Sequence, residues 1–246
     1  FGRLLGADAE SIENGTADYN AIEFEPFTWL FAAYVNENHP GVQKILKQAL
    51  EAEIVPNFAG YLGNADAGAV IQQVFAIWNV LQRNGVKYSN ITSNESEDVT
   101  LFSQHVRFLD EVVDNTQANC VDGTVLFASV LRKIGIQPYL ILAPGHMYLA
   151  FSLDGTDESL VGLETTLMGS TTLKSVGYNQ QLTHEMREQM KNEASWAAFE
   201  GAIDYGSKAL SEALAAINKS NDPRYQIVSI ALARKMGIMP IAFSQP

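Results

Sequence analysis

Cysteine is almost absent from this chain of 246 residues, which contains Cys120 and no other. An internal disulfide is therefore impossible, and the cysteine content says nothing about whether the compartment is oxidising. Positive charge is also scarce. With 16 Lys and Arg residues against 28 Asp and Glu residues, the net charge of −12 argues against nucleic acid or an anionic membrane surface as a general partner. The longest apolar stretches, near residues 29–35 and 136–143, are too short to span a bilayer, so we expect no integral membrane segment.

Several signatures of functional sites are missing as well. The sequence has no Gly-Lys-Ser/Thr phosphate loop, no Gly-x-Gly-x-x-Gly dinucleotide motif and no Gly-x-Ser-x-Gly serine motif. The acidic run over 95–98 lacks the ligand pattern of a calcium loop. The histidines do not have the spacing of a metal site; they are His39, His105, His146 and His184. We therefore expect neither a metal nor a cofactor.

The residues that are present are typical of one folded domain of the mixed α+β class. The contents of 47% apolar and 18% charged residues exclude disorder over the whole chain, which is long enough to bury a sizeable core. We expect a single domain over 1–246, with a core near 70–170 and helical extensions at both ends. Periodicity predicts helices over 27–34, 40–50, 69–83, 102–113, 120–134, 197–218 and 225–236, a helix-prone region from 183, and strands over 139–142, 146–151 and 160–164.

Cys120 lies at the predicted start of a helix, between Asn119 and Val121. Asn119 is a good candidate N-cap, which places Cys120 in the first turn. The backbone N–H groups of a first turn and the helix dipole stabilise a thiolate, the form of cysteine that attacks. Asp122 suits the same dipole but opposes a thiolate. The alternative is that Cys120 is a small buried hydrophobic residue, which is the usual role of a lone cysteine.

His146 and Glu164 add a base and a carboxylate to this cysteine. His146 follows a Pro-Gly turn and opens a predicted strand, so its backbone is fixed, as a general base requires. The stretch 152–159 is typical of a hairpin connection, which makes strands 146–151 and 160–164 antiparallel neighbours and brings Glu164 beside His146. We expect the Glu164 carboxylate to accept the Nδ1 proton and to stabilise the imidazolium. Taken singly, His146 also fits a turn histidine and Glu164 a solvated strand end.

Three segments together resemble a bacterial transglutaminase-like domain of the papain-fold superfamily. They are the stretch from Asn119 to Ile136, Pro144-Gly-His-Met-Tyr-Leu-Ala-Phe151, and Glu164-Thr-Thr166. The recurring pattern of that family, which these segments resemble, is a Cys that opens a helix ending in Leu-Arg-x-x-Gly-Ile, a later His on a strand, and an acid followed by Thr. Residues 74–81 and 86–89 resemble the helix and the Tyr-Ser turn that precede the Cys in such domains. The resemblance implies an α+β, papain-like fold in which the Cys-bearing helix packs on an antiparallel sheet.

The chain also departs from the family it resembles. The third residue of the triad is usually Asp there, and Glu164 is one methylene longer. The family often has Gly or Trp beside the Cys, where this chain has Asn119 and Val121. In the family an aromatic or Gln side chain normally helps the Cys backbone N–H to bind the oxyanion. Gln117 is the nearest candidate for that role, although its spacing to Cys120 does not match, and it also fits a polar loop residue.

The resemblance implies thiol chemistry on an amide of a peptide or protein substrate. In that interpretation Cys120 attacks, His146 takes and returns the proton, and Glu164 orients His146. Hydrolysis and amide exchange share the acyl-enzyme and differ in whether water or an amine resolves it. We favour hydrolysis, because water needs no second substrate site. The alternative from another class is a non-catalytic binding or scaffolding module with the same fold.

The compartment and the oligomeric state have little signal in the sequence. The chain begins at Phe1 rather than Met, which we interpret as a trimmed or mature form. A removed signal sequence would place the protein in the periplasm or the cell envelope.

Overall fold

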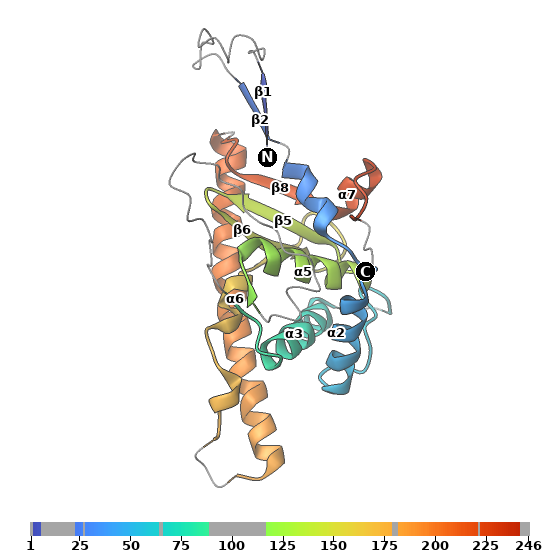
Figure 1. Ribbon diagram of the computed structural model, residues 1–246, viewed down its shortest axis with the longest axis vertical. Coiled ribbons are helices and arrows are strands. Elements are labelled where there is room, and N and C mark those ends of the chain that lie inside the picture. The colour runs from blue at the N-terminus through green and yellow to red at the C-terminus, as the bar shows by residue number, and fades with distance from the viewer. Residues whose placement is uncertain are drawn as a thin grey trace.

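A computed structural model gives the fold and describes residues 2–5, 23–26, 28–63, 66–88, 117–178, 182–220 and 222–241. Within these ranges the chain has a mixed α+β structure, in which a small antiparallel sheet lies between two layers of helices (Figure 1). The predicted α+β class is confirmed at this level.

The central sheet has four strands in the order β7-β6-β5-β8, and all neighbouring strands are antiparallel. Successive side chains of a strand point to opposite faces. On β6, Met147 and Leu149 therefore belong to one buried cluster, and Tyr148 and Ala150 to another. Both faces of the sheet are covered by helices. The strands are β5 (Pro138–Ala143), β6 (His146–Ser152), β7 (Leu160–Leu163) and β8 (Gln226–Ser229).

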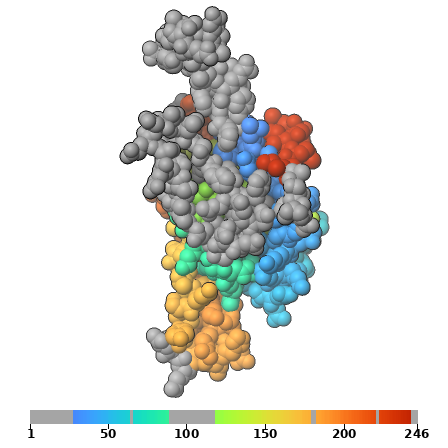
Figure 2. Space-filling view, viewed as in Figure 1, coloured from blue at the N-terminus to red at the C-terminus, as the bar shows by residue number. Residues whose placement is uncertain are grey.

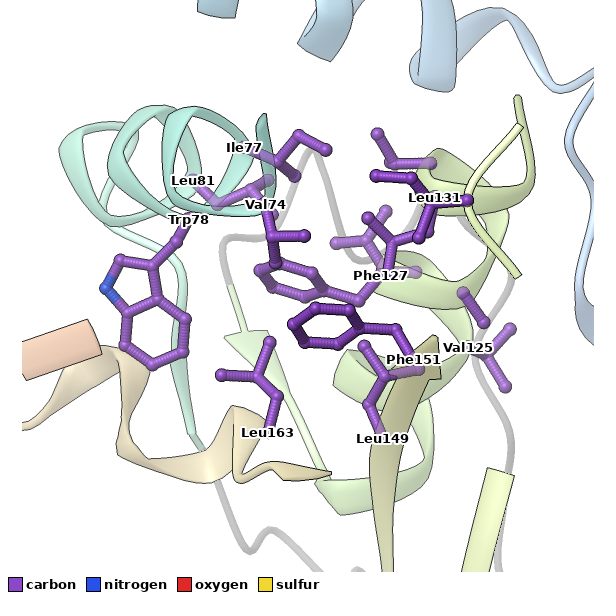
Figure 3. Close-up of a cluster of buried hydrophobic side chains, with 14 of the residues drawn as sticks. Val74, Ile77, Trp78, Leu81, Val125, Phe127, Leu131, Leu149, Phe151 and Leu163 are labelled. Atoms are coloured by element: carbon purple, nitrogen blue, oxygen red, sulfur yellow. The ribbon is translucent and has the colours of Figure 1, made fainter. Parts of the chain in front are cut away.

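One face of the sheet packs against α5 (Cys120–Lys133), with α3 (Ala67–Arg83) and α2 (Pro40–Glu51) beyond it. All residues of α5 through Leu131 are buried, as expected for a helix enclosed between a sheet and other helices. Trp78 and Phe127 lie 6.1 Å apart between ring centroids and meet large side chains of β6 and β7 (Figure 3). This apolar layer fixes α5 on the sheet, and with it the first turn of the helix.

The opposite face is covered by α6 (His184–Ser220), a helix of 37 residues. Its C-terminal half packs on β6 and β7, where Leu210 and Ala213 join the buried cluster of Tyr148. Its N-terminal half extends past the sheet (Figure 1) and lies at the lower end of the molecule (Figure 2). Arg83 of α3 holds that half, because its Nη1 donates to Glu188 Oε2 at 2.5 Å. No helix in the described ranges combines the length and the apolarity needed to cross a membrane.

Shorter elements connect these layers. β3 (Lys87–Tyr88) pairs in parallel with β4 (Gln117–Ala118), which leads directly into α5. Two 3-10 helices follow β7, namely η2 (Thr165–Gly169) and η3 (Leu173–Ser175). The others are η1 (Thr28–Tyr34), α7 (Ile230–Lys235), and the hairpin strands β1 (Gly2–Leu5) and β2 (Glu23–Pro26).

Most of the predicted elements are confirmed. The helices over 40–50 and 69–83, the helix that begins at Cys120, and the three predicted strands are present with shifts of a few residues at their ends. The short apolar helix expected over 27–34 is a 3-10 helix. The helix predicted over 102–113 lies outside the described residues.

One expectation about the C-terminal region was wrong. The helix predicted over 225–236 exists only from Ile230, because residues 226–229 form β8 and pair with β5. A short apolar run fits a strand or a helix equally well, and here the free edge of the sheet decides. The helix predicted over 197–218 and the helix-prone region from 183 are confirmed, and they form one continuous helix that begins at His184.

The backbones of β7 and α6 touch at two glycines. A Cβ on Gly162 would lie 2.1 Å from the Gly206 carbonyl oxygen, and a Cβ on Gly206 would lie 2.6 Å from Leu163 N. Next to this contact, the Glu164 amide donates to the Ala202 carbonyl at 3.0 Å. A side chain at either glycine would push the strand and the helix apart. This close contact therefore sets where the chain places Glu164.

We expect Gly206→Ala to destabilise the protein by about 3 kcal/mol, because the added methyl group would meet backbone atoms that cannot rotate away. Gly201→Ala in the same helix is the matched control. A Cβ there meets nothing within 4 Å, and replacing an exposed helical glycine by alanine should stabilise by up to about 1 kcal/mol. Denaturant unfolding measures both free energies, and equal effects at the two positions would contradict the close contact.

Candidate active site

Cys120 is the first residue of α5, and a capping box forms the start of that helix. Asn119 is the N-cap, as the sequence predicted. Its side chain accepts from the Asp122 amide at 2.8 Å, and the Asp122 carboxylate accepts from the Asn119 amide at 3.1 Å. The Thr124 hydroxyl lies 2.7 Å from the Cys120 carbonyl and 3.3 Å from the Met147 carbonyl, which ties this first turn to β6. The positive end of the helix dipole favours an anion at Cys120.

The β6–β7 hairpin brings Glu164 to His146. Leu149 pairs with Leu163, so the antiparallel register places the residue after β7 on the same side of the sheet as His146. His146 Nε2–H donates to Glu164 Oε2 at 2.7 Å, and the Cys120 side chain is a second hydrogen-bond partner of the imidazole. Side chains from the start of a helix, the start of a strand and the end of another strand thus form one hydrogen-bonded chain.

One detail of the expected triad is wrong. We expected Glu164 to accept the Nδ1 proton of His146, but Glu164 accepts the Nε2 proton. His146 begins β6, and Glu164 lies just beyond the end of the neighbouring strand β7. The ring therefore reaches the carboxylate with Nε2, the ring nitrogen farther from the backbone. Nδ1 is then the ring nitrogen left for the Cys120 thiol. A proton that moves between the thiol and the imidazole therefore moves at Nδ1.

Glu164 is a buried carboxylate, 2% exposed, and each of its oxygens accepts hydrogen bonds. Oε1 accepts from the Thr166 amide at 3.0 Å and from the Thr166 hydroxyl at 2.7 Å, while Oε2 accepts from His146. Burial by itself raises the pKa of Glu164, but the hydrogen bonds from His146 and Thr166 outweigh it and leave the pKa below its ordinary value. Glu164 is therefore an anion at neutral pH.

The imidazole of His146 is held as a cation between two acceptors. The hydrogen bond with Cys120 and then the hydrogen bond with Glu164 raise its pKa to about 10, although burial acts in the opposite direction. At neutral pH the site therefore holds an imidazolium with the Glu164 carboxylate on one side and the Cys120 sulfur on the other. Cys120 is only 7% exposed and Glu164 only 2%, whereas the His146 side chain between them is 34% exposed.

Tyr88 lies near the same groups and was not among the predicted site residues. Its strand pairs in parallel with β4, which places Tyr88 opposite Ala118, two residues before Cys120. The residue is 42% exposed. Partial burial, and then the charges of Cys120 and Glu164, raise the pKa of its phenol. Its only signal in the sequence is the Tyr-Ser turn of the family resemblance, because the β3–β4 pairing joins segments that are far apart in the chain.

A small pocket adjoins the first turns of α5. Its lining includes Tyr88, Asn119, Gly123, Phe127 and Thr165.

Gln117, expected as an oxyanion residue, has its backbone in β4, but its side chain lies outside the described part of the structure, so that role stays a prediction. Among the described residues, no group of three or more His, Cys, Asp or Glu side chains could hold a metal ion.

Glu164→Gln should lower the pKa of His146, because a neutral amide attracts the imidazolium less than a carboxylate does. The folded protein keeps the His146 proton up to about pH 10, whereas an unfolded histidine releases it near 6.5. This contribution to stability is therefore complete below pH 6.5 and is lost as the pH rises through 10. In Glu164→Gln the loss should occur at lower pH. NMR titration of the imidazole measures the change.

Glu188→Gln is the control for this titration, since Glu188 pairs with Arg83 and Lys191 instead. It should leave the His146 titration where it is in the wild type. The assigned ion pair would be refuted by an unchanged titration in Glu164→Gln.

Comparisons with protein-family models, with curated proteins and with solved structures find no match to this chain. The interpretation of Cys120, His146 and Glu164 therefore rests on their geometry and on the chemistry that this geometry permits.

Proposed function

We propose that the protein is a thiol-dependent hydrolase that cleaves an amide or peptide bond through an acyl-enzyme on Cys120. The observation that carries this proposal is the chain of thiol, imidazole and carboxylate, in which His146 bonds to Cys120 and, at 2.7 Å, to Glu164. A buried ion pair loses much of its attraction to the cost of desolvation, so stability alone is a poor reason to keep one. At a helix N-terminus, the same ion pair is what an activated cysteine requires.

In the acylation step the Cys120 thiolate attacks the carbonyl carbon, a C–S bond forms, and the electron pair of the C=O bond moves onto oxygen. The Asp122 and Gly123 amides of α5 already donate to Asn119, so we expect the Cys120 backbone N–H to donate to this oxyanion. The His146 Nδ1 proton then passes to the amide nitrogen, the C–N bond breaks and the amine leaves. Glu164 holds the ring through Nε2 during the transfer and stabilises it while it is charged.

Deacylation reverses the proton movement. Neutral His146 removes a proton from water as the water oxygen attacks the thioester carbon. The C–S bond then breaks, and the carboxylic acid leaves Cys120 as a thiolate beside the restored imidazolium. An amine in place of water would give amide exchange with the same bond changes. We favour water, because water needs no second substrate site, and we expect a peptide or protein substrate.

The papain-like, transglutaminase-like arrangement is our proposal for the finer fold. It is supported by the order of the elements, in which a Cys opens a helix, a His opens the second strand of an antiparallel sheet and an acid follows the third strand. The helix packs on that sheet, as the resemblance implies.

Alkylation with iodoacetamide at a series of pH values tests whether Cys120 is activated. Cys120 is the single cysteine of the chain, so the thiol signal needs no deconvolution. We expect stoichiometric labelling well below pH 8.5, the pKa of a free cysteine, because the imidazolium and the helix dipole hold the thiolate. His146→Asn should move the midpoint back toward 8.5. Wild-type labelling that begins only above pH 8 would contradict an activated nucleophile.

Cys120→Ser tests the acyl chemistry itself. Hydrolysis of p-nitrophenyl acetate and of a mixed peptide library should fall by at least about a thousandfold, because the hydroxyl is not ionised by the same partners. The melting temperature should fall only slightly, because the serine hydroxyl is smaller than the thiol but still offers His146 a hydrogen-bond partner. Equal rates in the two proteins would show that turnover does not pass through Cys120.

A non-catalytic binding or scaffolding module is the second candidate, and the burial of Cys120 favours it. With 7% exposure, the thiol has limited access for a substrate. In such a module, iodoacetamide would react no faster than the protein opens, and the rate would follow unfolding as denaturant is added. An activated site would instead react at a rate set by pH and by reagent concentration.

Tyr88→Phe separates acyl transfer from alkylation. If the Tyr88 hydroxyl donates to the oxyanion, its removal should slow ester and peptide hydrolysis by about a hundredfold. Alkylation forms no oxyanion, so its pH profile should stay unchanged. Tyr178→Phe is the control, because Tyr178 is 79% exposed and should affect neither reaction. A parallel loss of alkylation in Tyr88→Phe would mean that Tyr88 acts on the thiol instead.

A further inference from the structure

The imidazole of His146 has an aromatic neighbour on its own strand. His146 and Tyr148 lie two residues apart on β6, so their side chains leave the same face of the sheet. Their rings are stacked, with centroids 5.9 Å apart and planes 25° apart. The β6–β7 register also places Tyr148 across from the residue that follows Leu163, which is Glu164. Tyr148 therefore borders the ion pair of His146 and Glu164.

The Tyr148 ring has little freedom to move, because it is only 1% exposed and packs against other buried side chains. Its cluster contains Tyr139 of β5 and Leu210 and Ala213 of α6. A ring enclosed in this way has one orientation, and it presents a fixed face to the imidazole. The packing of α6 on the sheet is thus connected through one side chain to His146.

The Tyr148 hydroxyl does not explain why an aromatic residue is placed here. Its Oη atom is buried and has no hydrogen-bond partner in the described part of the chain. An unsatisfied buried hydroxyl destabilises a folded protein. Burial, and then the charges of Glu164 and Glu212, raise the pKa of the phenol, so it stays neutral. The use of Tyr148 must therefore lie in its ring.

We infer that Tyr148 is a positioning residue for His146: its ring holds the imidazole in the orientation that joins Cys120 to Glu164 and stabilises the imidazolium through its π face. A cation over an aromatic face gains energy even at a partly exposed site, and the His146 side chain is 34% exposed. The inference rests on the proposed function, since an imidazolium matters only if it maintains a thiolate.

The groups that set the charge of His146 come from three elements. The Cys120 thiol faces it from α5 and the Glu164 carboxylate from the end of β7, while Tyr148 lies beside it on β6. On the far side of Tyr148 the titratable neighbours are Glu212 of α6 and Tyr225. The two anions favour the charged imidazole, and Tyr148 adds an aromatic face without adding a charge. Loss of the ring should therefore shift the titration of the pair while both anions remain.

Three variants test this inference by the pH dependence of iodoacetamide labelling at Cys120. Tyr148→Leu removes the ring, and the labelling midpoint should rise by about one pH unit, equal to about tenfold less thiolate at a given lower pH. Tyr148→Phe keeps the ring and removes only the unpaired hydroxyl, so its profile should match the wild type and its melting temperature should be equal or higher. Tyr139→Leu is the matched control, because it removes an aromatic ring from the same cluster without touching His146.

The outcomes are separable from those of the proposed function. If wild-type Cys120 is not labelled below pH 8, the activated thiol itself is refuted. If the wild type is labelled at low pH and Tyr148→Leu retains that profile, only the role of Tyr148 is refuted. A shift of the same size in Tyr139→Leu would assign the effect to general loosening of the cluster. Should Tyr148→Leu fail to fold, Tyr148→Phe and Tyr148→Trp remain informative, since both must keep the low-pH labelling that the inference requires.

Discussion

The arrangement depends on one buried negative charge, the carboxylate of Glu164. A carboxylate that is 2% exposed cannot remain ionised without partners, and the nearest donors decide where the surrounding chain can go. Thr166 supplies two donors to one oxygen and His146 supplies one to the other. The hydrogen bond with Glu164 therefore holds the His146 imidazole at the end of β7 independently of Cys120. The packing of α5 on the sheet then brings Cys120 to the side of the imidazole that does not face Glu164.

Two contacts of very different kinds carry out that placement. On one face of the sheet, the apolar layer around Trp78 and Phe127 holds α5, and Thr124 ties its first turn to β6. On the other face, the backbones of α6 and β7 come into contact at Gly206 and Gly162, because neither glycine has a side chain to separate them. The site lies where the elements held by these contacts meet. Its geometry therefore depends on helix packing on both sides of a sheet that is only four strands wide.

The chemistry of the site follows from charge more than from exposure. The helix dipole and the imidazolium favour a thiolate at Cys120, and the Glu164 carboxylate acts through the imidazolium that it stabilises. The 7% exposure of Cys120 limits access to it. A nucleophile and a buried structural ion pair are therefore both consistent with the position, and they differ in how reactivity depends on pH. The stacked ring of Tyr148 belongs to this balance, because it supports the charged imidazole without introducing another charge.

The local features of the protein could be predicted from its amino-acid sequence. The N-cap preference of Asn119 located the start of α5, and the hairpin between two strand patterns was enough to bring Glu164 to His146. Both depend on neighbours in the chain, whose geometry short-range rules describe well. The remaining features depend on the tertiary structure. It selected Nε2 rather than Nδ1, turned residues 226–229 into an edge strand, and placed Tyr88 beside the site through a parallel pairing with a distant segment. These choices depend on which surfaces meet across the core, and periodicity along a single chain carries no information about the partner.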